Sequence, residues 1–247
     1  MEPVTTIQLP QRATLPNIEG VLSANSFFFL PRPRQYSLIF PKKDIFFEPM
    51  ALALLAAWGQ DQLSRGCTIS CENTDVAGAA YAWRMKLFEW LRFPYQTTRK
   101  THGASGRFVP LTKIDSNDQL ASFVESLGDV LHLSDVQQRD TVKYCFSELA
   151  RNVLEHAGNV PAFACAQYYE ALGTVSVGVA DCGRGIRSSF GSRYPTADDR
   201  EALGLALTPG VSGATSTREN AGAGLFFIKS GLPRFVWVNS GHFLSSR

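Results

Sequence analysis

The chain has 247 residues, of which 45% are hydrophobic and 19% are charged, and its formal net charge is +2. This composition is ordinary for a globular protein of one large or two small domains, and the small net charge disfavours a protein that wraps a polyanion. The longest apolar runs are shorter than the roughly 20 residues that span a bilayer, and no basic-then-apolar signal segment opens the sequence. Five cysteines without a paired framework favour reduced thiols. We therefore expect a cytoplasmic protein that binds neither membranes nor nucleic acid.

The N-terminal half predicts alternating strands and helices. Residues 1–34 mix Pro, Asn and Gln and are interpreted as an extension with one candidate strand. In residues 35–94, "YSLIF" and "CTISCEN" predict strands, and "EPMALALLAAWGQDQLSRG" and "TDVAGAAYAWRMKLFEWLRF" predict helices. Pro49 fits the first turn of the first helix, Gly66 fits its end, and a Thr/Asp pair is expected to cap the second helix. This order indicates a small α/β domain.

The second half of the chain predicts a linker and a larger domain. Residues 95–117 are polar, basic and Gly-containing, and we interpret them as a linker that ends in a strand at Phe108–Ile114. In residues 118–247, "NDQLASFVESLGDVL" and "SDVQQRDTVKYCFSELARNVLEHAG" predict helices, the second with a Ser/Asp cap and an end at Gly158. "AFACAQYYE" and "TVSVGVAD" predict a hairpin joined by "ALG". We expect later helices near "TADDREALGLAL" and "LFFIKSGL" and a final strand at "RFVWVNSG".

One predicted helix carries three polar residues four positions apart. Glu148, Asn152 and His156 advance by about 400° per step on a helix of 3.6 residues per turn, so they form one tilted stripe. In one interpretation the stripe is a solvated face on which Glu148 pairs with Arg151. In the other, a carboxylate and an amide oxygen one turn apart share a hard cation such as Mg²⁺. The helix by itself does not decide between them.

Two glycine-containing segments follow that helix. Asp181 ends a predicted strand, where it can accept a hydrogen bond from an exocyclic amine such as that of adenine, and Gly183 and Gly185 after it allow a close approach to a ligand. Gly222 and Gly224 directly precede a predicted helix, whose free N–H groups make an anion site. The loop between the two segments is long enough for a lid. Neither G-x-x-x-x-G-K-[ST] nor G-x-G-x-x-G in a βαβ unit is complete.

A helix with E-x-x-x-N-x-x-x-H, a strand that ends in D-x-G-x-G-I, and a loop followed by G-x-G-L at a helix start resemble, in this order, the GHKL superfamily of ATPases. This superfamily includes histidine-kinase catalytic domains and anti-sigma-factor serine kinases, and "EALGLALTPGVSG" is most similar to that branch. The matching segments lie between about residues 134 and 241. The resemblance implies an α/β (α+β) fold in which residues 118–247 form a two-layer α/β sandwich with a mixed sheet that binds ATP and Mg²⁺.

The resemblance also implies a role for each motif residue. Asn152 corresponds to the residue that coordinates Mg²⁺, and Glu148 to the catalytic residue that positions or activates a water molecule or a substrate hydroxyl. Asp181 corresponds to the residue that binds the adenine amine. The other implied ATP-binding residues are His156, Gly183, Gly185, Ile186, Gly222, Gly224, Leu225 and Lys229. For His156 and Lys229 a second interpretation stays open, namely a histidine at a helix end or core edge and a solvated lysine.

The N-terminal domain resembles the STAS-type α/β fold that accompanies such ATPases in anti-sigma systems. The phosphoacceptor Ser or Thr of that fold follows an Asp at a strand-to-helix turn, whereas "KKDIFFEPMA" has no hydroxyl residue near Asp44. We therefore expect a scaffold or docking domain. GHKL members also continue past "FVWVNSG" to a strand with a Gly-Thr pair, which the sequence lacks before Arg247. An abbreviated sheet, a sheet completed by a partner and a fragment all remain open.

These motifs predict an Mg²⁺-dependent ATP-binding protein that hydrolyses ATP slowly or transfers its γ-phosphoryl group to a protein in a bacterial-type regulatory system. The alternative is a non-catalytic switch whose nucleotide state sets its affinity for a protein partner. In either case we expect a protein partner or phosphoacceptor encoded nearby, and a homodimer is compatible with both. A histidine kinase is disfavoured because no dimerising phosphoacceptor helix precedes the ATPase region and His132 lies in a short segment.

Overall fold

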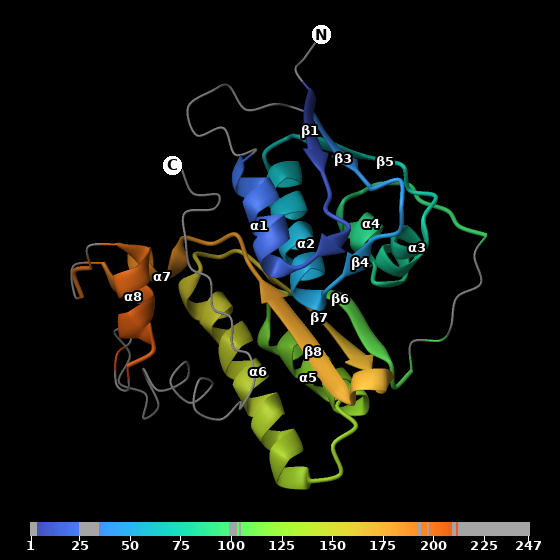
Figure 1. Ribbon diagram of the computed structural model, residues 1–247. Coiled ribbons are helices and arrows are strands. Elements are labelled where there is room, and N and C mark those ends of the chain that lie inside the picture. The colour runs from blue at the N-terminus through green and yellow to red at the C-terminus, as the bar shows by residue number, and fades with distance from the viewer. Residues whose placement is uncertain are drawn as a thin grey trace. The chain divides into compact units, whose positions relative to one another are not determined.

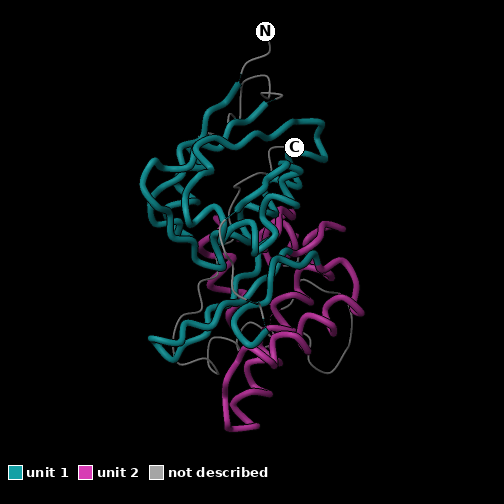
Figure 2. The backbone as a smooth tube through the Cα atoms, turned by 90° about the vertical axis from the view of Figure 1, so that its right-hand side faces the viewer, with its two compact units in different colours: residues 1–113, 163–180 teal, residues 114–162, 181–247 magenta. Residues whose placement is uncertain are grey.

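The computed structural model describes residues 4–24, 35–98, 103, 105–191, 194–196, 198–208 and 211. With 48% helix and 22% strand it is a mixed α/β protein, as predicted. The chain divides into two compact units, and each is assembled from two separate segments (Figure 2). The first unit combines residues 1–113 with 163–180, and the second combines residues 114–162 with 181–247.

A parallel sheet and its crossover helices form part of the first unit. Strands β1 (Val4–Gln8), β3 (Gln35–Ile39) and β5 (Thr68–Glu72) pair in that order, and helices α1 (Leu15–Ala24) and α2 (Pro49–Ser64) lie in the connections. Both connections step the same way across the sheet. Because such crossovers are right-handed, both helices are expected on the same face, and α1 and α2 do pack against each other (Figure 1).

Residues 4–24 pair and pack within this unit and do not form a separate extension, and β1 agrees with the one candidate strand expected there. β1 is an edge strand of the sheet, and β2 (Arg12–Ala13) pairs with β4 (Phe46–Phe47). The guanidinium of Arg12 lies 5.1 Å from the centre of the Phe46 ring. The prediction also missed α1, although its buried residues recur at helical spacing. They are Leu15, Ile18 and Leu22.

Helix α2 is buried around most of its circumference. Pro49 stands at its first position, where the missing N–H has no intrahelical acceptor, and the helix ends just before Gly66, which has a φ of +81°. The residues 51–53 and 55–59 are all buried, so apolar contacts surround the helix. It packs on α1, on β5, on β8 (Thr174–Ala180) and on α4 (Leu87–Trp90).

The second predicted helix is in fact two helices. They are α3 (Ala77–Arg84) and α4 (Leu87–Trp90). Lys86 separates them, because its left-handed backbone, with a φ of +63°, cannot continue a right-handed helix. The sequence contains no Gly or Pro at this break, so nothing in it indicated that the predicted helix would be interrupted there.

The predicted Thr/Asp cap of α3 was also wrong. The N-cap residue is Val76, which has no side-chain acceptor. Instead, Asp44 from the loop after β3 accepts a hydrogen bond from the Gly78 N–H at 2.7 Å. A Cβ on Gly78 would collide with the carbonyl oxygen of Ile45, so this loop and α3 meet at backbone contact. In this arrangement Asp44 serves as the cap of a distant helix.

The first unit also contains a sheet from the middle of the chain. β6 (Phe108–Ile114), β7 (Ala162–Tyr169) and β8 form this sheet in that order. β7 and β8 are antiparallel and are joined by a 3₁₀ turn at Glu170–Leu172. The predicted strand at Phe108–Ile114 and the predicted hairpin are both confirmed.

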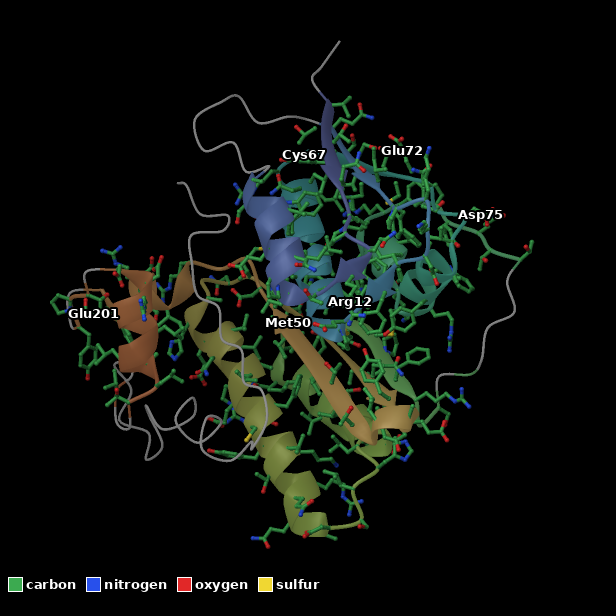
Figure 3. All side chains as sticks on the ribbon, viewed as in Figure 1. Arg12, Met50, Cys67, Glu72, Asp75 and Glu201 are labelled. Atoms are coloured by element: carbon green, nitrogen blue, oxygen red, sulfur yellow. The ribbon has the colours of Figure 1, made fainter. Side chains whose placement is uncertain are left out.

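The start of α2 packs directly on this hairpin (Figure 3). A Cβ on Gly178 of β8 would lie 2.5 Å from the Pro49 carbonyl oxygen and 2.5 Å from the Met50 nitrogen. The Cys165 thiol of β7 donates to the same Pro49 carbonyl at 3.2 Å. The first compact unit therefore includes residues from both sides of the expected limits at 94 and 118.

The second unit is helical where the structure describes it. Its helices are α5 (Asn117–Val130), α6 (Val136–His156), α7 (Gly185–Phe190) and α8 (Asp199–Ala206). The Asp135 side chain caps α6 and accepts hydrogen bonds from the Gln137 and Gln138 N–H groups, in agreement with the predicted Ser/Asp cap. Phe123 and Phe146 stack between α5 and α6 with ring centres 4.7 Å apart. The predicted α8 is confirmed, and the short α7 was not predicted.

Several predictions fall outside the described residues. They concern the lid loop, the helix "LFFIKSGL", the strand "RFVWVNSG", and the residues Gly222, Gly224, Leu225 and Lys229. Among the described helices, none combines the length and apolar character that crossing a membrane requires.

Candidate functional site

Glu148 is held in an ion pair on α6. Arg151 follows Glu148 by three residues on the helix, and its Nη1 donates to Glu148 Oε1 at 2.8 Å. The solvated-face interpretation predicts this pair. The Glu148 side chain is 16% exposed and that of Arg151 is 47% exposed. A general base must present a free lone pair to the proton that it takes. For Glu148 to act on a substrate through Oε1, this ion pair has to open.

Asn152 has unused hydrogen-bonding capacity. Its Nδ2 is buried and has no partner among the residues that the structure describes. A buried polar atom without a partner costs about 1–3 kcal/mol, so such atoms call for an explanation, and a bound ion or water is one. A half-turn of the amide exchanges its nitrogen and oxygen, so the same place can present a donor or an acceptor. Asn152 can therefore offer an oxygen to a cation without giving up an existing hydrogen bond of Nδ2.

Asp181 directly follows β8, at the position predicted from the sequence. Burial raises the pKa of its carboxyl group, while the hydrogen bond from the Gly183 N–H to Oδ1, at 2.7 Å, lowers it. In the described part of the chain the Asp181 side chain makes no other hydrogen bond. Its Oδ2 is thus free to accept from the amine of a ligand.

The loop after Asp181 packs on the carboxyl end of α6. A Cβ on Gly183 would lie 2.5 Å from the Ala157 carbonyl oxygen and 2.7 Å from Asp181 Oδ1, so only glycine fits. The Arg184 N–H donates to the Ala157 carbonyl at 3.0 Å, and Arg184 Nε donates to the His156 carbonyl at 2.7 Å. The packing of the loop on α6 accounts for Gly183 without any ligand.

Gly185 and Ile186 belong to the start of α7. Gly185 has a φ of +75°, which favours glycine, and it is the first residue of the helix. Ile186 packs against an apolar cluster that joins α7 to α8. The buried members of this cluster are Phe190, Ala202 and Ala206. The structure thus gives both residues a local role in folding.

His156 lies at the last position of α6. Its side chain is 25% exposed and Nε2 lies 3.9 Å from Glu155 Oε2. The carbonyl of His156, rather than its imidazole, makes the contact with the loop after β8. This arrangement favours the interpretation of His156 as a residue at a helix end.

The loop from Asp181 to Arg184 meets the end of α6 at His156 and Ala157, and Asn152 and Glu148 lie about one and two turns earlier on that helix. Sequence reasoning missed Arg184. The last carbonyls of a helix attract basic side chains, so an arginine close to α6 could have been expected, but nothing in the sequence identified which one.

A separate open hollow lies along the amino-terminal half of α6. It has a volume of about 550 Å³ and is lined by Val136, Gln137, Asp140, Thr141 and Tyr144. The hollow includes neither Asn152 nor Asp181. We favour the latter pair as the candidate site, because they have unused hydrogen-bonding capacity, whereas the hollow is lined by one helix alone.

The residues present fit a magnesium ion that is bound mainly by a nucleotide. In the ranges that the structure describes, no group of three or more His, Cys, Asp or Glu side chains is placed to hold a metal ion. Asn152 offers one amide oxygen. Mg²⁺ commonly takes few protein ligands and fills its shell with phosphate oxygens and water, so one protein oxygen is compatible with such a site.

Comparison with known proteins returned no match. No protein-family model matches the chain, and no curated protein or solved structure is significantly similar to it. The resemblance to the GHKL superfamily therefore rests on the order of the sequence motifs.

Proposed function

We propose that the second unit binds Mg·ATP between the carboxyl-terminal turns of α6 and the loop that begins at Asp181. The observation that carries this proposal is the pair of hydrogen bonds that holds that loop against the end of α6. It joins Asp181 to the helix that contains Asn152. Within the described part of the chain, one carboxylate oxygen of Asp181 and the buried amide nitrogen of Asn152 have no hydrogen-bond partner. Such polar groups on connected segments can orient a ligand at its base and phosphate ends.

At the base end, Oδ2 of Asp181 would accept a hydrogen bond from the exocyclic amine of adenine. The hydrogen bond from Gly183 keeps the other carboxylate oxygen in place, so the free oxygen points in a defined direction. A buried polar partner of this kind rejects bases that lack the complementary donor, because the group is then left unpaired.

At the phosphate end, Asn152 would hold Mg²⁺ through its amide oxygen. The ion, when bound, neutralises negative charge on the phosphates. By resemblance, the turn at Gly222 and Gly224, followed by Leu225 and Lys229, would cover the phosphate groups.

The ion pair of Glu148 with Arg151 supports the second candidate, a nucleotide-gated switch without fast chemistry. In this conformation one oxygen of Glu148 already accepts a hydrogen bond from a guanidinium group. Binding of Mg·ATP would then alter the affinity for a protein partner, and phosphoryl transfer through Oε1 of Glu148 would require Arg151 to move.

Thermal unfolding with and without Mg·ATP tests the proposal. A ligand at 100 times its Kd stabilises the folded state by about 2.7 kcal/mol, which shifts Tm by several degrees. We expect this shift in the wild type and in Asp118→Ala, which removes an exposed carboxylate of α5. We expect no shift in Asp181→Ala. An equal shift in Asp181→Ala, or none in the wild type, contradicts the proposal.

Release of labelled γ-phosphate separates the two candidates. If Glu148 is the base, Glu148→Gln should lower the rate by about 100-fold or more, while Glu155→Gln, about two turns further along α6, should not. The same background rate in all three proteins, together with intact Mg·ATP binding, would identify the switch.

A further inference from the structure

Helix α6 ends with carbonyl groups that have no donor inside the helix. The last four carbonyls of any α-helix lack an intrahelical N–H, so the groups at the end of α6 need partners from elsewhere. The Ala157 N–H still donates to the Val153 carbonyl, but the carbonyls of His156 and Ala157 lie past the last hydrogen bond within the helix. Gly158, with a φ of +90°, then turns the chain away from the helix axis.

Arg184 supplies both missing donors. Its backbone N–H donates to the Ala157 carbonyl at 3.0 Å, and its Nε donates to the His156 carbonyl at 2.7 Å. Arg184 Cδ also lies 3.9 Å from the place where a Cβ on Gly158 would stand. A cation at the carboxyl end of a helix is favoured by the helix dipole as well. One residue thus contacts all three positions at the end of α6.

The contacts of Arg184 extend to Asp181 through one intervening residue. Gly183, next to Arg184, touches Ala157, and its N–H holds Asp181 Oδ1 at 2.7 Å. A shift of the loop away from α6 would therefore move the Asp181 carboxylate relative to the helix.

We propose that Arg184 is a positioning residue, which holds the Asp181 carboxylate in place relative to Asn152 and so determines base selectivity. This inference rests on the proposed binding of a nucleotide. It differs from a direct role of the guanidinium, whose Nη atoms make no hydrogen bond within the described part of the chain and could meet a phosphate. A phosphate contact would serve every nucleoside triphosphate equally. Positioning of Asp181 affects only the ligand whose base Asp181 binds.

The test compares dissociation constants for Mg·ATP and Mg·GTP in the wild type, Arg184→Met, Arg184→Lys and Arg187→Met. Arg187 is the matched control, because it is also exposed and also donates to one backbone carbonyl, that of Thr196 at 3.2 Å. In Arg184→Met we expect affinity for ATP to fall about tenfold, with a smaller loss for GTP, so that the preference for ATP shrinks. Arg184→Lys should recover part of this preference, since its ammonium group can reach the helix end. Arg187→Met should stay within about twofold of the wild type.

Equal losses for ATP and GTP in Arg184→Met would overturn the inference, because a phosphate contact or a general loss of folded protein reduces both affinities alike. An unchanged ATP preference in Arg184→Met would overturn it as well.

Hydrogen exchange in the ligand-free protein tests separately whether the Arg184 side chain holds the loop against α6. Without the Nε hydrogen bond, segment 181–190 should open more often, and its amides should exchange about tenfold faster in Arg184→Met than in the wild type. Exchange in α5 should not change. If the amides of residues 181–190 exchange equally fast in Arg184→Met and the wild type, and the wild type binds ATP, the inference about Arg184 is overturned while the proposed function stands. Absence of nucleotide binding in the wild type overturns the proposed function and this inference with it, whatever the exchange rates.

Discussion

At the scale of single residues, the described groups of the candidate site are defined by what they leave unsatisfied. The Asp181 carboxyl group is buried, which disfavours its charged form, and one hydrogen bond from Gly183 offsets only part of that cost. Asn152 Nδ2 is buried and finds no hydrogen-bond partner in the ranges that the structure describes. Groups that reduce stability in this way occur preferentially at functional sites, because a ligand satisfies them.

The raised pKa of Asp181 predicts how its replacement changes stability with pH. The folded state binds the proton of this group more tightly than the unfolded chain does. The stability that this group contributes is therefore fully present at pH values below the ordinary pKa of an Asp carboxyl group. It is lost as the pH rises through the folded-state pKa of Asp181. Asp181→Asn keeps an acceptor for the Gly183 N–H but carries no charge. We expect this variant to be more stable than the wild type at pH 7, in urea denaturation, with the difference shrinking as pH falls towards 3.

A variant that is less stable than the wild type at pH 7 would contradict this account of Asp181. Asp118→Asn, at an exposed position on α5, is the control and should change stability little at either pH.

At the scale of elements, close backbone contacts determine how helices meet strands and loops. Asp44 caps α3 from a distant loop, Arg184 binds the end of α6, and Gly178 lets the start of α2 reach β8. Each contact joins residues far apart in the sequence, and each depends on one residue type. At Gly178, for example, there is no space for a larger side chain between β8 and α2.

Gly178→Ala should destabilise the first unit. Its Cβ would lie 2.5 Å from two backbone atoms of α2, which can only be relieved by moving the helix, and overpacking of this kind costs about 1–3 kcal/mol. Gly20→Ala in α1 is the matched control, because nothing lies within 4 Å of its added Cβ. There the gain in helix propensity should stabilise the protein by about 0.5–1 kcal/mol. Urea denaturation followed by the fluorescence of the buried Trp58 measures both effects. Equal stability of the two variants would contradict the close packing of α2 on β8.

At the scale of the whole molecule, each compact unit is discontinuous in sequence. The hairpin β7–β8 follows α5 and α6 along the chain, yet it belongs to the first unit, where it packs on α2. A chain arranged in this way cannot complete the first unit until residue 180 is present.

This arrangement predicts which fragments fold. A fragment of residues 1–113 lacks β7 and β8, leaves the start of α2 uncovered and should lose cooperative unfolding. A fragment of residues 1–180 contains the whole first unit and should retain it. Chemical denaturation monitored by tryptophan fluorescence distinguishes the two. If residues 1–113 unfold cooperatively at the same denaturant concentration as residues 1–180, the domain limits expected from the sequence describe the protein better than the compact units do.

Much of the local structure was predictable from the sequence. Pro49 and Gly66 bound α2, Asp135 starts α6, and the hairpin and the strand at Phe108–Ile114 follow from alternation and turn residues. The break at Lys86 was not predictable, because its left-handed backbone follows no Gly or Asn signal. The cap of α3 was missed because its acceptor comes from Asp44, more than thirty residues away.

For the candidate site, the sequence by itself determined which residues carry polar atoms at recurring helical positions, because spacing along a helix dictates which side chains are neighbours. The Glu148–Arg151 pair belonged to one of the two interpretations that this spacing left open. Only the tertiary structure decided that Asn152 Nδ2 is buried with no partner among the described residues, that Gly183 is required by its contact with Ala157, and that Arg184 joins the loop to α6. These facts depend on which segments pack together, and burial and hydrogen bonding between distant segments exist only after the chain has folded.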